Sequence, residues 1–203
     1  MRLTRSFPVL LTALIAAVSA TGVTAQTVLR FGHANSPGEI AHDLYKEFAD
    51  NVTKKSGGQL TVRVFPSEQL GKEVDLLQQL KSGALDISSP SMPTLNSMVP
   101  AFEMPSAPFL WRDWKEAETV IRGPAMEPIW TELKDRHNIV PLTKIWYWGW
   151  RNFTFGTKEV RRPEDMAGLK VRVPESPIWV EMVRGFGAAP TPIPFGEVYT
   201  ALQ

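Results

Sequence analysis

One basic segment in the last third of the chain offers the clearest chemistry. Residues 168–176 read Gly-Leu-Lys-Val-Arg-Val-Pro-Glu-Ser. The alternation of apolar and basic residues predicts a strand with two valines on one face and with Lys170 and Arg172 on the other. Arg172 therefore lies away from the core side. A guanidinium group in such a position suits a carboxylate partner, which either the protein or a ligand can supply.

The residues alone do not decide whether that carboxylate belongs to the protein or to a ligand. A surface ion pair between Arg172 and Glu175 is the simpler interpretation. Arg151 favours the alternative, because it follows Trp148-Gly149-Trp150 directly. A second guanidinium beside aromatic rings suits an organic anion that has an apolar part. For Trp146, Trp148 and Trp150 themselves, packing in the core is the favoured interpretation, because they alternate along a strand-like segment.

Catalytic signatures that the sequence can reveal are absent. The chain has no Gly-x-Ser-x-Gly elbow, no Gly-Lys-Ser/Thr phosphate loop and no His-Glu-x-x-His motif. The three histidines, His33, His42 and His137, do not have the spacing of metal ligands. We therefore expect a protein that is not an enzyme and that has no cofactor and no metal site.

The first 25 residues have the pattern of a secretory signal peptide. Arg2 and Arg5 precede an apolar run, and small residues follow it as far as Ala25, where we expect cleavage. The chain has no cysteine, which fits export to a bacterial periplasm without disulfides. Its 22 basic and 21 acidic residues nearly balance, which argues against nucleic acid as a partner.

The pattern of elements predicts an α/β fold in which strands and helices alternate. Residues 26–148 begin with a strand at 28–32, a helix from 36, a strand at 60–64, a helix over 74–84 and a strand that begins at 86. This order is typical of a mainly parallel sheet with right-handed crossovers. Ser36-Pro37-Gly38-Glu39 predicts the first helix start as a capping box. The repeat of apolar residues places one set on a single helical face: Ile40, Leu44, Phe48 and Val52.

Residues 90–108 are rich in proline, serine and methionine, which predicts an irregular region. Two helices should follow at 114–122 and 125–136, and then a strand at 139–148. Gly149 is the expected domain boundary. The second unit, 149–203, should contain a strand at 152–155, a helical turn at 163–167, the Gly168 strand, and a helix over 176–183 with Ser176 as its N-cap. Pro190, Pro192 and Pro194 should then hold the chain extended before a helix near Phe195.

Several of these segments, taken together, resemble the periplasmic solute-binding subunit of a tripartite ATP-independent periplasmic (TRAP) transporter of the DctP type. The resemblance rests on residues 29–33, 65–71, 79–86, 168–176 and 190–203. It implies a two-lobed periplasmic binding protein fold, type II-like, in which the lobes close on a ligand by a hinge. Family chains continue beyond Ala-Leu-Gln at 201–203. The resemblance therefore predicts that residues 1–203 are an incomplete copy whose second lobe is truncated.

The resemblance also implies roles for individual residues. Arg172 matches the arginine that forms a two-pronged salt bridge with the substrate carboxylate, and Arg151 falls where some members have a second ligand-facing arginine. Phe195 matches an aromatic residue that packs on the ligand. His33 and the loop around Ser91 match first-lobe positions that face the cleft. With Trp148, which precedes Arg151, these residues form the predicted ligand-binding set.

The sequence therefore predicts a periplasmic protein that captures a small organic acid. The resemblance implies that it delivers the acid to a permease formed by a small and a large TRAP membrane subunit. Two alternatives stay open: a carboxylate-binding protein that serves a sensor or another importer, and a periplasmic enzyme on a related fold.

Overall fold

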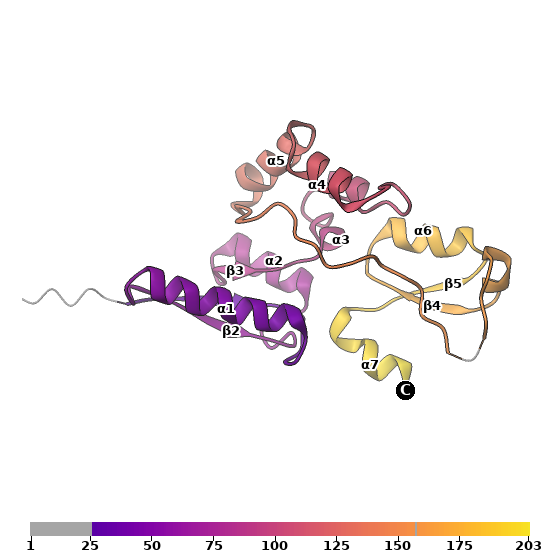
Figure 1. Ribbon diagram of the computed structural model, residues 1–203, viewed down its shortest axis with the longest axis horizontal. Coiled ribbons are helices and arrows are strands. Elements are labelled where there is room, and N and C mark those ends of the chain that lie inside the picture. The colour runs from indigo at the N-terminus through magenta and orange to yellow at the C-terminus, as the bar shows by residue number, and fades with distance from the viewer. Residues whose placement is uncertain (1–25, 157) are drawn as a thin grey trace, which may run out of the picture.

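The computed structural model of the protein describes residues 26–156 and 158–203 (Figure 1). The predicted signal peptide, 1–25, lies outside the described residues. Two separate parallel sheets organise the described chain, one of three strands near its beginning and one of two strands near its end. Helices and an extended segment connect the two sheets (Figure 1).

The first sheet has the predicted parallel topology. Its strands are β1 (Thr27–Gly32), β2 (Leu60–Phe65) and β3 (Ile87–Ser88), in the order β2-β1-β3. Thr27 lies opposite Leu60, and Gly32 lies opposite Ser88. The crossovers that parallel strands need are α1 (Ile40–Lys55) and α2 (Glu73–Ser82). The predicted alternation of strands and helices in this unit is therefore confirmed.

The start of α1 differs from the prediction. The helix begins at Ile40, three residues after the expected first position at Pro37. Half of the predicted capping box forms, because the Ser36 backbone N–H donates to Glu39 Oε1 over 2.7 Å. Gly38 adopts φ +91°, a left-handed conformation that interrupts the helix between these two residues.

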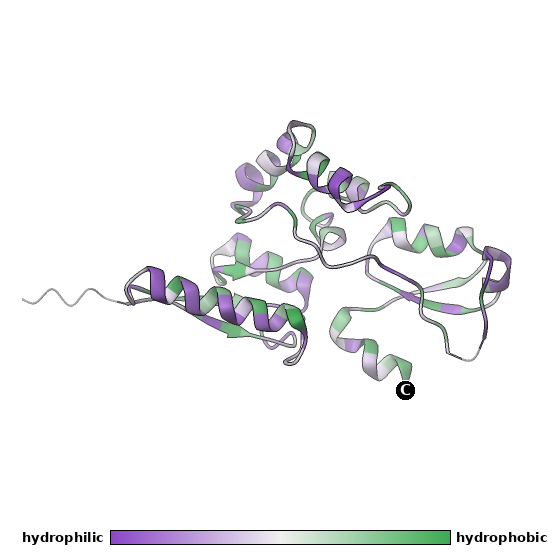
Figure 2. Ribbon diagram, viewed as in Figure 1, coloured by the Kyte–Doolittle hydropathy of each residue, from purple (hydrophilic) through white to green (hydrophobic). Residues whose placement is uncertain are grey.

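The buried face of α1 also differs from the apolar repeat in the sequence. Hydrophobic and hydrophilic turns alternate along the helix (Figure 2). Most of the apolar set is nevertheless solvent-accessible, with Ile40 80% exposed and Leu44 45% exposed. Small side chains let the helix approach the sheet closely, and Tyr45 then packs on Phe31 with ring centroids 4.8 Å apart. The helix residues in this core are Ala41, Tyr45 and Ala49.

The region predicted to be irregular contributes to the largest core. It contains α3 (Met92–Leu95) and the 3-10 helix η1 (Pro100–Ser106), so the prediction of an irregular segment was wrong. Phe102 is fully buried, and its ring meets Trp130 edge-on at 4.7 Å. Apolar burial outweighs the weak helix propensity of this proline-rich sequence. The core consists of Leu77, Leu95, Met98, Val99, Phe102, Ala117, Ile121, Met126, Trp130 and Leu133.

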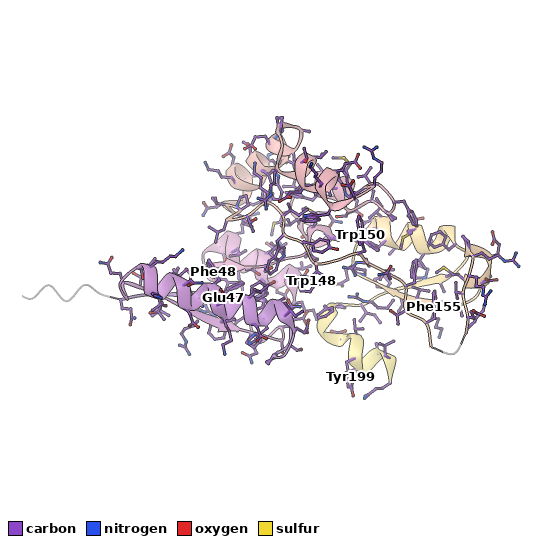
Figure 3. The ribbon with its side chains drawn as sticks, viewed as in Figure 1. Glu47, Phe48, Trp148, Trp150, Phe155 and Tyr199 are labelled. Atoms are coloured by element: carbon purple, nitrogen blue, oxygen red, sulfur yellow. The ribbon has the colours of Figure 1, made fainter. Side chains whose placement is uncertain are left out.

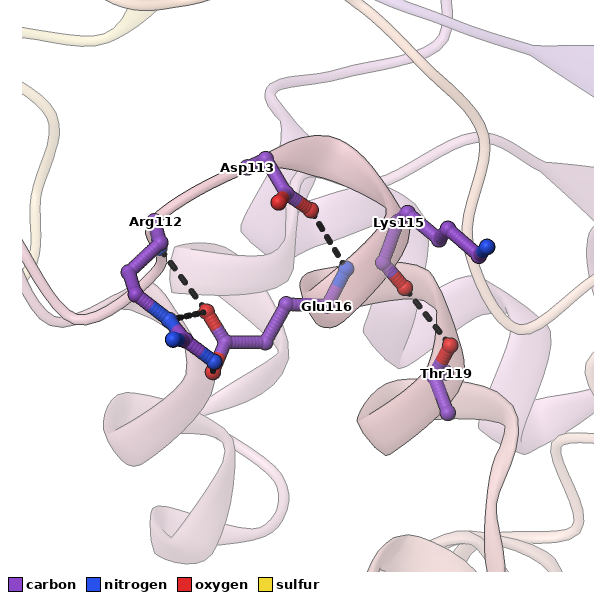
Figure 4. Close-up of polar contacts among 5 residues, drawn as sticks. All are labelled: Arg112, Asp113, Lys115, Glu116 and Thr119. Carbon is purple, nitrogen blue, oxygen red and sulfur yellow. Dashed lines mark hydrogen bonds and ion pairs between the residues drawn. The ribbon is translucent and has the colours of Figure 1, made fainter.

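Two helices pack over this core at about the predicted positions. They are α4 (Trp114–Arg122) and α5 (Glu127–His137), and the short η2 (Pro124–Met126) separates them. A reciprocal cap fixes the start of α4 (Figure 4). Asp113 Oδ1 accepts from the Glu116 N–H over 2.8 Å, and Glu116 Oε2 accepts from the Arg112 N–H over 3.0 Å.

Residues 139–156 run between the two sheets without forming the predicted strands at 139–148 and 152–155. Side chains anchor the segment: Trp146 stacks on Tyr45 at 5.2 Å, and Tyr147 meets Trp114 at 5.0 Å. Its backbone pairs with neither sheet of the described chain, and a strand is defined by such pairing. Trp148 and Trp150, on this segment in Figure 3, are 56% and 57% exposed, so core packing of the tryptophans was the wrong interpretation for them.

The second sheet contains the segment with Arg172. Its strands are β4 (Lys170–Val173) and β5 (Ala189–Pro192), which are parallel and are joined by α6 (Pro177–Gly185). Ser176 is the N-cap residue of α6, as predicted. The prolines of β5 fit the sheet because the residues on either side donate instead, Ala189 to the Leu169 carbonyl and Ile193 to the Val173 carbonyl.

Shorter helical elements complete the second unit. They are η3 (Pro163–Met166), η4 (Phe195–Glu197) and α7 (Val198–Leu202). The predicted helical turn before the Gly168 strand and the predicted helix near Phe195 are therefore confirmed.

Direct contacts join the two units. Glu103 of η1 accepts from the Ser176 hydroxyl over 2.8 Å and from the Ile178 N–H over 2.6 Å, which caps α6 from the first unit. Lys72, the N-cap residue of α2, forms an ion pair with Glu197 of η4. These contacts place the start of α2 beside the end of the second sheet. Among the helices in 26–156 and 158–203, none is long and apolar enough to cross a membrane.

Candidate functional site

Arg172 lies on β4 with its side chain half-buried, on the face opposite the buried Val173. Its Nε and Nη2 atoms donate to the Ile193 carbonyl over 2.9 and 2.6 Å. These bonds hold the guanidinium in one orientation and leave its Nη1 N–H groups, with the second N–H of Nη2, for another acceptor. Within the described part of the chain no carboxylate lies within ion-pair distance of Arg172, and this includes Glu175.

Arg151 extends from the segment between the sheets and lies over the Trp179 ring of α6, with Cζ 4.9 Å from the ring centroid. Its side chain makes no hydrogen bond or ion pair with any residue in 26–156 or 158–203. Burial lowers the pKa of Arg151, and the negative charge of Glu73 opposes part of this effect. Arg151 is exposed as a whole, so burial affects only the part of the guanidinium that lies against the Trp179 ring, and the group has no direct anionic partner among the described residues.

The two arginines act on each other electrostatically. Burial lowers the pKa of Arg172, and the positive charge of Arg151 lowers it further, while Glu73 and Glu175 act in the opposite direction. Two nearby cations of this kind attract an anion strongly, because its binding relieves both their repulsion and their desolvation. Chemically, the arrangement is suited to bind a carboxylate.

The first unit supplies a fixed carboxylate opposite the arginines. Glu73 is the first residue of α2, directly after the Lys72 that pairs with Glu197. Its Oε2 atom accepts from the Ser91 N–H over 3.2 Å, from the Ser91 hydroxyl over 2.7 Å and from the Thr94 hydroxyl over 2.5 Å. Ser91, predicted to face a ligand, therefore holds Glu73 in place, and its own contact with a ligand stays a prediction.

His33 lies in the interior of the first unit and is 1% exposed. Its Nδ1 atom accepts from the Asn35 backbone N–H over 3.1 Å, so the proton of the neutral ring is on Nε2, which donates to His42 Nδ1 over 3.3 Å. Burial, followed by the charge of His42, lowers the pKa of His33 to about 4. Both ring nitrogens are occupied by protein groups, and a role for His33 in ligand contact stays a prediction.

Trp148 and Phe195 are the accessible aromatic members of the predicted set. Trp148 meets Trp146 edge-on at 6.0 Å, and Phe195 is 44% exposed at the start of η4. The Glu68 carboxylate lies directly against the next residue, Gly196, where it occupies the space that a larger side chain would need, and this brings the turn close to the first unit. A ligand contact by either ring also stays a prediction.

Two carboxylates in these contacts were not singled out from the sequence. Glu73 looks like an ordinary acid in the first turn of a helix, where the helix dipole favours negative charge. Glu103 lies in a proline-rich segment, and its role depends on a helix that is 73 residues away in the chain. No local sequence signal marks either contact. In the part of the chain that the structure describes, no group of three or more His, Asp or Glu side chains is arranged to hold a metal ion.

Comparison with known families gives a match over most of the chain. Residues 31–203 match the family described as "Bacterial extracellular solute-binding protein, family 7", which is the DctP family. The match covers the second sheet and all of the first sheet except residues 27–30 of β1.

Curated relatives agree with this match. The chain is 31% identical over 191 residues to the 2,3-diketo-L-gulonate-binding periplasmic protein YiaO of Escherichia coli, covering 93% of this chain and 57% of that protein. It is also 31% identical over 191 residues to the sialic acid-binding periplasmic protein SiaP of Vibrio cholerae, covering 94% of this chain and 59% of that protein. The chain thus spans somewhat more than half the length of these relatives.

Solved structures show the same fold. The sugar acid binding protein DctPAm from Advenella mimigardefordensis, in complex with galactonate, matches with a TM-score of 0.82 and 30% identity, over 87% of this chain and 56% of that chain. A TRAP periplasmic solute binding protein from Sulfurospirillum deleyianum, with bound succinate, matches with a TM-score of 0.81 and 30% identity, over 88% of this chain and 57% of that chain.

The predicted family and the predicted α/β fold of the two-lobed periplasmic binding protein class are therefore confirmed, while the domain boundary at Gly149 stays a prediction. On the match over residues 31–203, this chain belongs to family 7 of the bacterial extracellular solute-binding proteins, the DctP family.

Proposed function

We propose that this protein captures a small organic acid in the periplasm by its carboxylate group. The observation that carries the proposal is the pair formed by Arg151 and Arg172. Arg172 is half-buried, Arg151 lies over the Trp179 ring and its charge acts on Arg172, and neither has an ion-pair partner in 26–156 or 158–203. A carboxylate between them would satisfy N–H groups that the protein leaves free.

The two arginines have different parts in this proposal. Arg172 is held by the Ile193 carbonyl, so it offers its Nη1 and Nη2 atoms as a fixed, end-on pair of donors. Arg151 is supported only by the face of Trp179, and it adds charge from the segment between the units. Trp148 and Phe195 cover the apolar part of the acid, while Ser91 and His33 shape the first-unit side. Closure of the two units around the acid then excludes water and strengthens the ion pair.

Calorimetric titration of the purified protein with organic acids tests the proposal. Arg172→Ala should weaken binding about 100-fold, because a charged hydrogen-bonded pair contributes roughly 1.5–3 kcal/mol. Arg172→Lys should restore only part of the affinity, since an ammonium cannot form the same paired contact. Lys170→Ala is the matched control, because Lys170 is an exposed basic residue on the same strand and its loss should leave affinity unchanged. Equal affinity of Arg172→Ala and Lys170→Ala would contradict the proposal.

Delivery of the acid to a membrane permease is the second part of the proposal, and family membership supports it. The partners are a small and a large TRAP membrane subunit. Uptake of the acid into vesicles that contain both subunits should depend on added protein, and Arg172→Ala should reduce it. Uptake that does not depend on the protein would favour service to a sensor or to another importer.

The proposal includes neither covalent chemistry nor a cofactor, and family membership among solute-binding proteins supports this. The bound acid should be recovered unchanged after incubation, as measured by NMR. It also includes export by the signal peptide at 1–25, with cleavage after Ala25. Mass spectrometry of the protein from a periplasmic extract should give a mature chain that begins at Gln26.

A further inference from the structure

Glu68 extends toward the second unit from an unusual turn of the first unit. Ser67 and Glu68 both have left-handed backbone conformations, with φ +52° and φ +57°, which residues other than glycine seldom adopt. The Ser67 N–H donates to the Asn35 carbonyl over 2.9 Å. The Glu68 N–H donates to the His33 carbonyl over 3.1 Å. These bonds fix the turn, and therefore the position from which the Glu68 side chain extends.

The Glu68 carboxyl group lies directly against Gly196 of the second unit. A Cβ atom on Gly196 would be 2.8 Å from Glu68 Cδ and closer still to Glu68 Oε2, and the three heavy atoms nearest to it all belong to Glu68. Gly196 lies in η4, a helical conformation that any residue can adopt. The missing side chain therefore makes room for the Glu68 carboxyl group and is not required by the backbone.

This contact leaves one oxygen of the carboxyl group buried without a partner. Glu68 Oε1 is buried, and it has no hydrogen-bond partner in the described part of the chain. An ionised oxygen in such a place is costly, whereas a protonated carboxyl group has no charge to bury. Burial raises the pKa of Glu68 accordingly, and the backbone of Gly196 opposes part of this effect.

The charged groups that face Glu68 come from both units. From α2, Glu73 raises the pKa of Glu68 further and Lys72 lowers it, and from η4, Glu197 raises it. Lys72 and Glu197 form an ion pair with each other, so their effects oppose each other. His33, whose carbonyl holds the turn, has a pKa of about 4 and is mostly neutral at pH 5 and above.

We infer that Glu68 is a closure contact that takes up a proton from solvent when the two units close on the acid, so that capture is tighter at acidic pH. The inference rests on the proposed function and adds regulation to the same site. Separation of the units returns Glu68 to water and the proton to solvent, because Gly196 moves away with the second unit. By linkage, the closed state gains stability as the pH falls through the raised pKa toward the ordinary value of 4.5.

Calorimetry on the purified protein tests the inference. A thermal-shift panel of galactonate, gluconate, galacturonate, glucuronate, lactate and pyruvate, all ionised at pH 5, identifies the acid used as the probe. That acid should bind about 3-fold or more tightly at pH 5 than at pH 8. Titrations at pH 5.5 in two buffers of different ionisation enthalpy should show net proton uptake on binding. Glu68→Gln should abolish both effects, because the amide keeps the size of the side chain and does not titrate. Glu47→Gln, which removes an exposed acid of α1 (Figure 3), should retain both.

A steric variant tests the contact independently of charge. Gly196→Ala places a methyl group where the Glu68 carboxyl group lies, so it should displace that group and remove the pH dependence as Glu68→Gln does. Adding Gly196→Ala to Glu68→Ala should not change the affinity further, because the methyl group then meets no carboxyl group.

Unfolding midpoints without ligand at each pH show whether each variant is folded. An affinity that is the same at pH 5 and pH 8, or a pH dependence that Glu68→Gln leaves intact, would overturn the inference while the proposed function stands. Binding of none of the six acids at either pH would contradict both.

Discussion

The two units of the molecule differ in how far their charged and polar side chains have partners within the protein. In the first unit, Glu73 is held by three hydrogen bonds, and the buried His33 stays neutral with both nitrogens paired. In the second, Arg172 shares one carbonyl acceptor between two donors, and Arg151, on the segment that leads to it, has only an aromatic face. The difference is that the polar groups of the first unit have protein partners, whereas the two arginines have no anionic partner among the described residues, which agrees with the proposed capture of a carboxylate.

The largest expected effect is the loss of acid affinity when an arginine is removed. Arg151→Met should weaken acid binding about 100-fold, which corresponds to about 2.7 kcal/mol. The same change should not lower the stability of the free protein, because among the described residues Arg151 has no hydrogen-bond or ion-pair partner to lose, and a Met side chain can still pack on Trp179. Calorimetry and thermal unfolding of the variant measure the two effects.

Glu73→Gln is the matched first-unit variant. It should lower the stability of the free protein, because the carboxylate accepts charge-assisted hydrogen bonds from Ser91 and Thr94. If Arg151→Met were also destabilised in the absence of ligand, the proposed difference between the two units would be wrong.

Acid should destabilise the first unit through His33. Its pKa is about 4 in the folded protein, against an ordinary value of 6.5, because of burial and then the charge of His42, with Glu39 acting in the opposite direction. Between these two values the unfolded chain binds more protons than the folded chain, so stability falls as the pH decreases from about 6.5 to about 4. The loss should be on the order of 2 kcal/mol.

Urea unfolding at pH 7, 6, 5 and 4 measures this loss. His33→Gln should reduce the pH dependence in this range, whereas His137→Gln, at the end of α5, should leave it unchanged. Identical pH profiles for the original protein and for His33→Gln would contradict the account of the histidine pair.

Glu103 tests the contact that joins the two units. Glu103→Ala should destabilise the protein by about 1.5 kcal/mol, because the buried Ser176 hydroxyl and the Ile178 N–H lose their acceptor. Glu132→Ala, which removes an exposed pair with Arg136, should change stability by less than about 0.5 kcal/mol. Similar urea midpoints for the two variants would show that the capping contact contributes little.

The smallest expected effect lies far from the arginines. Asp113→Ala removes the cap of α4 and should cost about 1 kcal/mol of stability. Acid affinity should not change, because α4 belongs to the first-unit core. A calorimetric titration in which Asp113→Ala weakens binding as much as Arg151→Met does would show that affinity merely follows stability.

Local patterns in the sequence predict the elements of both sheets well. The Gly168 strand, the start of α6 at Ser176 and the first parallel unit depend on short-range signals: alternation, capping residues and turns. The predicted strands at 139–148 and 152–155 fail because a strand also requires a neighbouring backbone, which a local pattern does not specify. The exposed face of α1 shows a similar limit, since Ile40 and Leu44 repeat regularly while Ala41 and Tyr45 make the contact with the sheet.

The residues of the candidate site show the same limit: some can be found from local sequence patterns and others only from the fold. Arg172 and Arg151 are singled out in the sequence by strand alternation and by neighbouring tryptophans, but the residues alone favour an ion pair of Arg172 with Glu175, and the family resemblance is what favours a ligand carboxylate. Glu73 is not visible, because its significance comes from Ser91, Thr94 and the second unit, all of which are brought to it by the fold. A residue whose role depends on partners that are distant in the sequence can be identified only from the structure.

A crystal structure of the protein with a bound acid tests the central claim most directly. The acid should be the one that stabilises the protein most in the thermal-shift panel. We expect its carboxylate within about 2.7–2.9 Å of the Arg172 Nη atoms, with Arg151 as the second cation. A carboxylate bound away from both arginines, with Arg172 still held only by the Ile193 carbonyl, would contradict the account.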